Sequence, residues 1–106
     1  MGNTKLGIPI IKAETFWERF SGFMFKKSAN YALLFNNCKS IHTCFMRFDV
    51  DVVYLDKSNR VLKVIKSLQP FKVAFLVKNS ASILEIPSNM TNAEELAIGK
   101  KIDCLF

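Results

Sequence analysis

Short apolar runs separated by polar or proline-containing breaks follow one another along most of the chain. Runs of this length are typical of β-strands, and turns spaced this closely favour a β-rich fold over a helical one. We therefore predict strands at residues 8–13, 31–35, 41–48, 51–56, 61–68, 81–86 and 102–106. Between two of these strands, the loop at residues 57–60 predicts a hairpin, with Asn59 in a left-handed conformation.

Two segments predict short helices instead. Thr15 can cap the free amides of a helix start while Glu18 reaches back to the Thr15 amide, and Gly22 suits the end of that helix. Thr91 and Glu94 repeat the capping pattern before a second short helix. The predicted fold is mainly β, with a β-rich α+β fold as the alternative. We expect one compact antiparallel barrel or sandwich decorated by two short helices.

Length and composition indicate one domain covering residues 1–106. It is large enough to bury a core without disulfide bonds or a structural metal. Half of the residues are hydrophobic and ten are Phe, which excludes a disordered chain. No apolar run approaches the roughly 20 residues that span a bilayer, so we expect no membrane span. The first residues do not resemble a signal peptide, and we expect a cytoplasmic protein.

The formal net charge is +6, and the lysines are scattered singly or in pairs. Such a balance can attract nucleic acid, acidic lipid or an acidic partner, but scattered lysines are typical of a solvated basic surface. Because neither a glycine-rich loop nor a regular pattern of stacking aromatics accompanies the charge, we do not expect nucleic acid as the partner.

Three segments carry a family resemblance. They are Gly22-Phe23-Met24-Phe25-Lys26-Lys27-Ser28, then His42-Thr43-Cys44-Phe45-Met46-Arg47 followed by residues 51–56, and finally Ile83-Leu84-Glu85-Ile86-Pro87 with Ile98-Gly99 near the end. Together they resemble the uncharacterised bacterial and archaeal family catalogued as domain of unknown function 192. The resemblance runs from about residue 13 to the C-terminus. It implies a compact β-rich fold and no established reaction, cofactor or substrate.

Most of the side chains that could bind a ligand or take part in catalysis lie in the second of these segments. Arg47 offers a planar, permanently charged fork for a carboxylate or phosphate, and we take His42, Met46, Arg47 and Asp51 as candidate ligand-binding residues. Strand alternation over residues 41–48 places His42 and Met46 on the face opposite Arg47, so one flat site cannot use all three unless the strand bends. The competing interpretation is that Arg47 pairs structurally with a nearby aspartate, Asp49 or Asp51.

Zinc binding and thiol catalysis are two more specific hypotheses, and the spacing of the residues supports them less well. Cys38, His42, Cys44 and Cys104 are ligand types suited to zinc, yet no Cys-x-x-Cys pair is present, and the cysteines fit small core residues better. A Cys44 nucleophile with a His42 base is hindered because residues two apart on a strand lie about 6–7 Å apart. We therefore expect no catalytic residues, metal ligands or cofactor.

The function that these residues favour is a small binding or accessory module without catalytic activity. Its partner would be an unidentified small ligand or protein, and we expect the module to be a monomer. The alternative is an enzyme or metal-binding protein that uses the region of His42, Cys44 and Asp51.

Overall fold

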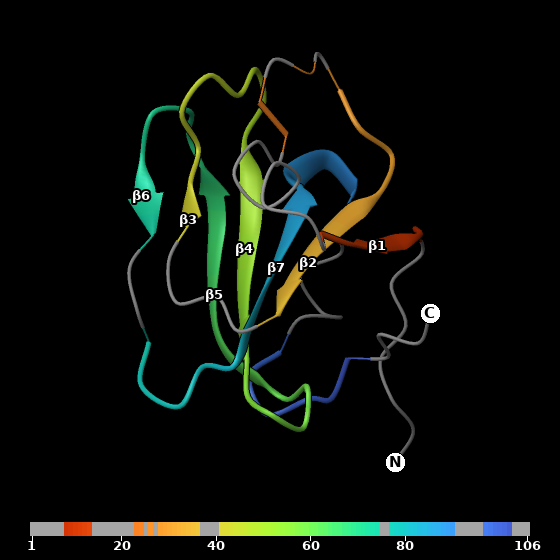
Figure 1. Cartoon of the computed structure of the whole chain (residues 1–106), viewed down its shortest axis with the longest axis vertical. Helices are drawn as coiled ribbons and strands as arrows, with labels where there is room; N and C mark the ends of the chain where they lie inside the picture. The colour runs from red at the N-terminus through yellow and green to blue at the C-terminus, as the bar shows by residue number, and fades with distance from the viewer. Residues whose placement is uncertain are drawn as a thin grey trace.

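The computed structural model of the chain describes residues 8–13, 23–24, 26, 28–36, 41–74, 77–90 and 97–102, and the structural statements below concern these residues. They form a sheet-dominated body in which the main strands run side by side (Figure 1). Its five-stranded sheet has the order β1-β2-β7-β4-β5. The strands are β1 (Ile10–Lys12), β2 (Ala32–Asn36), β4 (Val50–Leu55), β5 (Val61–Leu68) and β7 (Ser82–Pro87).

A second, two-stranded sheet pairs β3 (Ile41–His42) with β6 (Val73–Ala74). It lies beyond the β5 edge in Figure 1. All pairings in the two sheets are antiparallel except that of β1 with β2, which is parallel. A short 3-10 helix, η1 (Ser88–Met90), follows β7.

Both faces of the large sheet are covered, which explains why every residue of β4 and β7 is buried. One face contributes Leu33, Phe35, Val52, Tyr54 and Ile83 to a cluster that also contains Phe23 and Met46. The other face contributes Leu34, Val53, Leu55, Leu84 and Ile86 to a cluster that also contains Ile102. Strands that are covered on both faces have mostly apolar sequences, and in this pair Asp51, Ser82 and Glu85 are the buried polar exceptions.

The mainly β prediction is confirmed, with strands close to five of the predicted ranges. The prediction of one strand over residues 41–48 is wrong, because the strand ends at His42 and turns occupy the residues after Thr43. Phe45 there has a φ of 61°, far outside the range of regular β-strands. Strand β6 was not predicted, and β1 is parallel to its neighbour rather than antiparallel as expected.

Other predictions fall partly outside the described residues. The helices expected to start at Thr15 and Thr91 lie there, as does the last strand beyond Ile102. The hairpin prediction is confirmed, since Asn59 has a φ of 63°. Within the described chain, the large sheet has β1 and β5 as open edges and is not closed into a barrel. No helix there is long and apolar enough to cross a membrane.

Candidate functional site

The four residues predicted to form a binding site occupy different environments. Met46 is buried in the core cluster, whereas Arg47 is exposed on the loop between β3 and β4. His42 is half-buried in β3, and its Nδ1 accepts a hydrogen bond from the backbone N–H of Cys44 at 3.2 Å. The structure therefore places these residues near one end of β4 without directing them all into one cavity.

Asp51, the fourth candidate, is fully buried, and its carboxylate interacts with donors from three residues. Its Oδ1 accepts hydrogen bonds from the Ser67 N–H and the Ser88 hydroxyl, both at 2.8 Å. Its Oδ2 lies 2.6 Å from the ammonium of Lys66. Among the described residues, Asp51 thus forms an ion pair with Lys66, and its hydrogen bonds from Ser67 and Ser88 join β4 to the end of β5 and to η1.

Metal and thiol chemistry receive no support from the described geometry. The Cys44 sulfur is a free thiol in a half-buried setting, while Cys38 and Cys104 lie outside the described residues. Among the residues described, no three of the types His, Cys, Asp and Glu gather closely enough to hold a metal ion. The bond between Cys44 and His42 runs through the Cys44 backbone rather than through its thiol.

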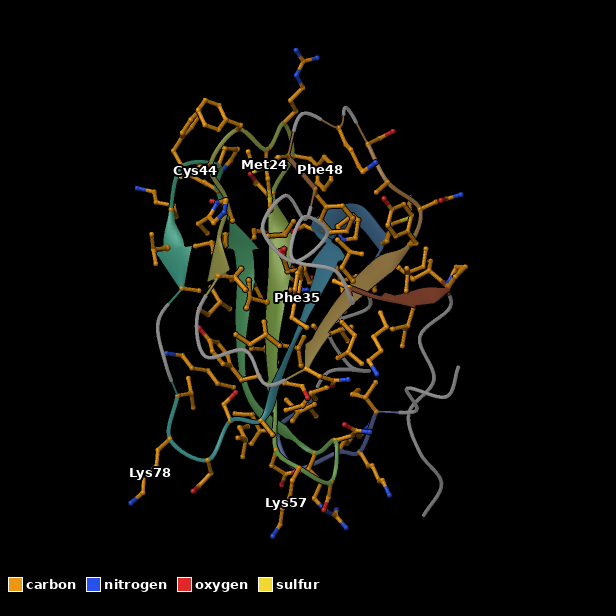
Figure 2. The ribbon with its side chains drawn as sticks, in the orientation of Figure 1. Met24, Phe35, Cys44, Phe48, Lys57 and Lys78 are labelled. Carbon is orange, nitrogen blue, oxygen red and sulfur yellow. The ribbon has the colours of Figure 1, made fainter. Side chains whose placement is uncertain are left out.

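A ligand-sized cavity lies at the other end of β4, and we call it the hairpin pocket. Its volume is about 520 Å³, within the range of small-molecule sites. Its lining comes from the β4–β5 hairpin and from the turn before β7: Asp56, Lys57, Ser58, Leu62, Asn79, Ser80 and Ala81. Figure 2 shows Lys57 and Lys78 at the lower end of the molecule and Cys44 at the upper end.

Asp56 organises one wall of the hairpin pocket. Its Oδ1 accepts hydrogen bonds from the backbone N–H groups of Ser58 at 2.8 Å and Arg60 at 3.0 Å. The Arg60 hydrogen bond is the main cause that lowers the pKa of the Asp56 carboxyl, and burial opposes it only partly. The pocket therefore contains a fixed carboxylate beside the cationic Lys57.

The opposite wall is a turn that brings small polar side chains to the hairpin. Asn79 has a φ of 70°, and the Ser80 N–H donates to the carbonyl of Val77 at 3.0 Å. The Ala81 N–H donates to the Leu55 carbonyl at 2.8 Å, which ties this turn to the end of β4. The hairpin pocket was not predicted from the sequence, because its two walls are far apart in the chain. The only local signal was the concentration of turn-forming residues in each wall.

A second feature missed from the sequence is Glu85, in the middle of the buried strand β7. It is paired in register with Leu33 and Val52, so it shares the sheet face of the Phe23 and Met46 cluster. Its Oε2 is buried and has no hydrogen-bond partner among the described residues. Desolvation raises the pKa of Glu85 to about 8. The sequence signal for this buried carboxyl was a single acidic residue within an apolar run.

Comparisons with known proteins place the chain in an uncharacterised group. The profile of the DUF192 family, described as "Uncharacterized ACR", matches residues 2–104. A UPF0127 protein of Thermococcus sibiricus is 33% identical over 97 residues, covering 86% of this chain and 62% of the relative. One from Thermococcus kodakarensis is 34% identical over 96 residues, covering 85% of this chain and 60% of the relative. The chain thus spans about three fifths of the length of these relatives.

Two crystal structures have a similar fold. A protein of unknown function from Novosphingobium aromaticivorans superposes with a TM-score of 0.77 at 15% identity, covering 91% of this chain and 74% of that one. A putative transcription regulator from Sinorhizobium meliloti gives a TM-score of 0.72 at 13% identity, covering 87% and 78%. At this identity the likeness establishes a common fold and nothing about function.

Proposed function

This chain belongs to the DUF192 family of uncharacterised proteins, and from its hairpin pocket we propose that it is a small ligand-binding module without catalytic activity. The observation that carries the proposal is a cavity of ligand size where several polar side chains from two separate segments converge. A pocket with a few convergent polar groups is the usual form of a small-molecule site.

The chemistry of the lining favours a hydroxylated ligand that carries an anionic group. The Lys57 ammonium can pair with phosphate or carboxylate, and the Ser58 hydroxyl can donate to the same group. The Ser80 hydroxyl donates to the Ser82 carbonyl at 3.4 Å and can accept from a ligand hydroxyl. The Asp56 carboxylate, kept ionised by its backbone donors, can accept a hydrogen bond from a ligand hydroxyl. Leu62 offers the lining an apolar surface for a carbon skeleton. A sugar phosphate combines these features.

The proposal is tested by NMR titration with ribose 5-phosphate, alongside ribose and inorganic phosphate as separate probes. We expect ribose 5-phosphate to shift the backbone amides of Lys57, Ser58, Asn79 and Ser80, and each fragment to shift part of this set. Lys57→Ala should weaken the affinity about tenfold, the loss expected for one hydrogen bond to a charged group.

Lys26→Ala is the matched control, because Lys26 is an exposed lysine outside the pocket lining. It should leave the affinity unchanged. Equal losses in the two variants, or shifts that avoid the pocket amides, would contradict the proposal.

We further propose that the module acts as a monomer in the cytoplasm. The free, half-buried thiol of Cys44 suits a reducing compartment. Light scattering after size-exclusion chromatography measures the oligomeric state. Fractionation of cells that express the protein measures its location.

A further inference from the structure

Two exposed phenylalanines form a projecting pair at the opposite end of the molecule from the hairpin pocket. Phe45 lies on the loop after β3 and is 50% exposed, and Phe71 lies on the loop before β6 and is 65% exposed. Their rings meet edge to face with centroids 5.6 Å apart. We call Phe45, Phe71 and the half-exposed Val73 the aromatic tip. Figure 2 shows Cys44, the neighbour of Phe45, at this upper end.

The backbone holds both rings outward in a conformation that bulky residues avoid. Phe45 has a φ of 61° and Phe71 a φ of 62°. The left-handed region is disfavoured for a residue with a bulky side chain by about 1–2 kcal/mol. Such outliers persist where the surrounding structure enforces them, and they concentrate at functional sites. Both phenylalanines thus combine an unfavourable backbone conformation with a ring that is at least half exposed.

Thr43 is the residue that enforces this geometry, because it links the two loops. Its buried hydroxyl donates to the Gln69 carbonyl at 2.6 Å and accepts from the Lys72 N–H at 2.8 Å. Its carbonyl accepts from the Phe71 N–H at 3.0 Å, and its own N–H donates to the Lys72 carbonyl at 2.8 Å. These bonds tie the two loops together, which lowers the ordering cost of binding through them.

The charge around the aromatic tip favours an anionic partner. Arg47 and Lys72 are exposed and lie within two residues of Phe45 and Phe71 in the chain, against one exposed carboxylate in the same loops, that of Asp49. The whole chain carries a formal net charge of +6. An anionic surface is thus attracted both by the molecule as a whole and by the exposed cations of the two loops that carry the rings.

The small area of the projecting apolar surface distinguishes between a protein partner and a membrane. A stable protein–protein interface buries about 800 Å² on each side, far more than three half-exposed side chains supply. Binding at a membrane interface needs only a few apolar groups at headgroup depth together with cations that meet lipid phosphates. We propose that the aromatic tip docks this domain on an anionic membrane surface, with Phe45 and Phe71 inserted between headgroups and Arg47 and Lys72 against phosphates.

The test is co-sedimentation of the protein with phosphatidylcholine vesicles that contain or lack phosphatidylglycerol. We expect binding to the anionic vesicles, weakened by added salt. The double variant Phe45→Asn/Phe71→Asn should reduce the partition coefficient about tenfold or more, because it removes the apolar contribution. Asn tolerates the left-handed conformation, so the variant should fold, and its thermal unfolding curve verifies this.

Matched controls distinguish binding through the aromatic tip from nonspecific adsorption of other exposed apolar or basic side chains. Ile98→Asn removes a 73% exposed apolar side chain elsewhere and should leave binding unchanged. Arg47→Gln/Lys72→Gln should lower binding to anionic vesicles several-fold more than Lys63→Gln/Lys78→Gln, which removes the same charge away from the tip.

Three outcomes would overturn the proposal. One is a folded Phe45→Asn/Phe71→Asn variant that binds anionic vesicles as well as the parent. Another is the absence of any binding to anionic vesicles at low salt. The third is binding of a thymidine oligonucleotide through the same four side chains without vesicle binding, which would assign the tip to single-stranded nucleic acid.

Discussion

The ammonium of Lys66 lies 2.6 Å from the buried Oδ2 of Asp51, so a charged group near the start of β4 is neutralised by the neighbouring edge strand. Ser67, the next residue, has a φ of 52°, and the β4–β5 register shifts between Val50 and Val52. Asp51 therefore stabilises an irregularity in β5 by accepting the Ser67 N–H. The hydrogen bond from the Ser88 hydroxyl joins the start of η1 to the same carboxylate.

Replacing the Asp51 carboxylate should strongly destabilise the fold. Asp51→Ala leaves the Ser67 N–H and the Ser88 hydroxyl without their acceptor, and we expect a loss of about 3 kcal/mol in the free energy of unfolding. Lys66→Met should cost less than Asp51→Ala, because the Asp51 carboxylate loses its counter-charge but keeps the hydrogen bonds from Ser67 and Ser88, and the Lys66 side chain is already 45% exposed. Urea unfolding of both single variants and the double variant gives the coupling energy. Equal losses for the two single variants would contradict this account.

The buried carboxyl of Glu85 should make stability depend on pH. Its pKa is raised from 4.5 to about 8, so between these values the folded chain binds a proton that the unfolded chain has released. Stability should therefore fall as pH rises through this window and level off above it, with a slope of at most about 1.4 kcal/mol per pH unit from this group.

Glu85→Gln provides the control for that slope, because it keeps the shape and removes the titration. Chemical unfolding of the parent and of Glu85→Gln across pH 5 to 9 should show a stability difference that increasingly favours the variant as the pH rises. Parallel stability curves for the two proteins would refute the assignment.

Loss of the Thr43 hydroxyl should loosen the aromatic tip. Thr43→Val removes an acceptor from the Lys72 N–H and a donor to the Gln69 carbonyl, at a cost of about 2 kcal/mol. Thr43→Ser keeps the hydroxyl and should cost less than half as much. Hydrogen exchange at the amides of Phe71 and Lys72 reports the loosening directly, and unchanged exchange in Thr43→Val would argue against the linking role.

Asparagine at either tip position should not destabilise the protein, in contrast to most Phe replacements. Phe71→Asn loses little burial, since Phe71 is 65% exposed, and it relieves an unfavourable φ. We expect the melting temperature to stay equal or rise. A drop corresponding to more than about 1 kcal/mol would show that the ring contact with Phe45 outweighs the backbone cost.

Local patterning predicted most of the large sheet because strand formation follows from apolar runs and turn residues. Val61–Leu68 has the predicted bounds, and Asn59 takes the left-handed conformation expected of a hairpin loop. The same reasoning failed over residues 41–48, where alternation suggested a strand. There the Thr43 hydrogen bonds to residues 69 and 72 replace a continuous strand ladder with a turn.

The candidate site was harder to predict than the fold. His42, Met46, Arg47 and Asp51 were grouped by chemistry and by nearness in sequence, and the structure gives each a different environment. Asp51 illustrates the reason: its donors come from Lys66, Ser67 and Ser88, and only the antiparallel order of β5, β4 and β7 brings them together.

The sequence by itself determined the mainly β class, the hairpin around Asn59 and the family, because apolar periodicity, turn chemistry and spacing are local properties of the chain. The tertiary structure alone decided which polar and aromatic groups meet. Asp56 shares a pocket with Asn79, and Phe45 touches Phe71, because strand order and register place distant loops at the same ends of the sheet. Such contacts depend on the packing of the whole chain.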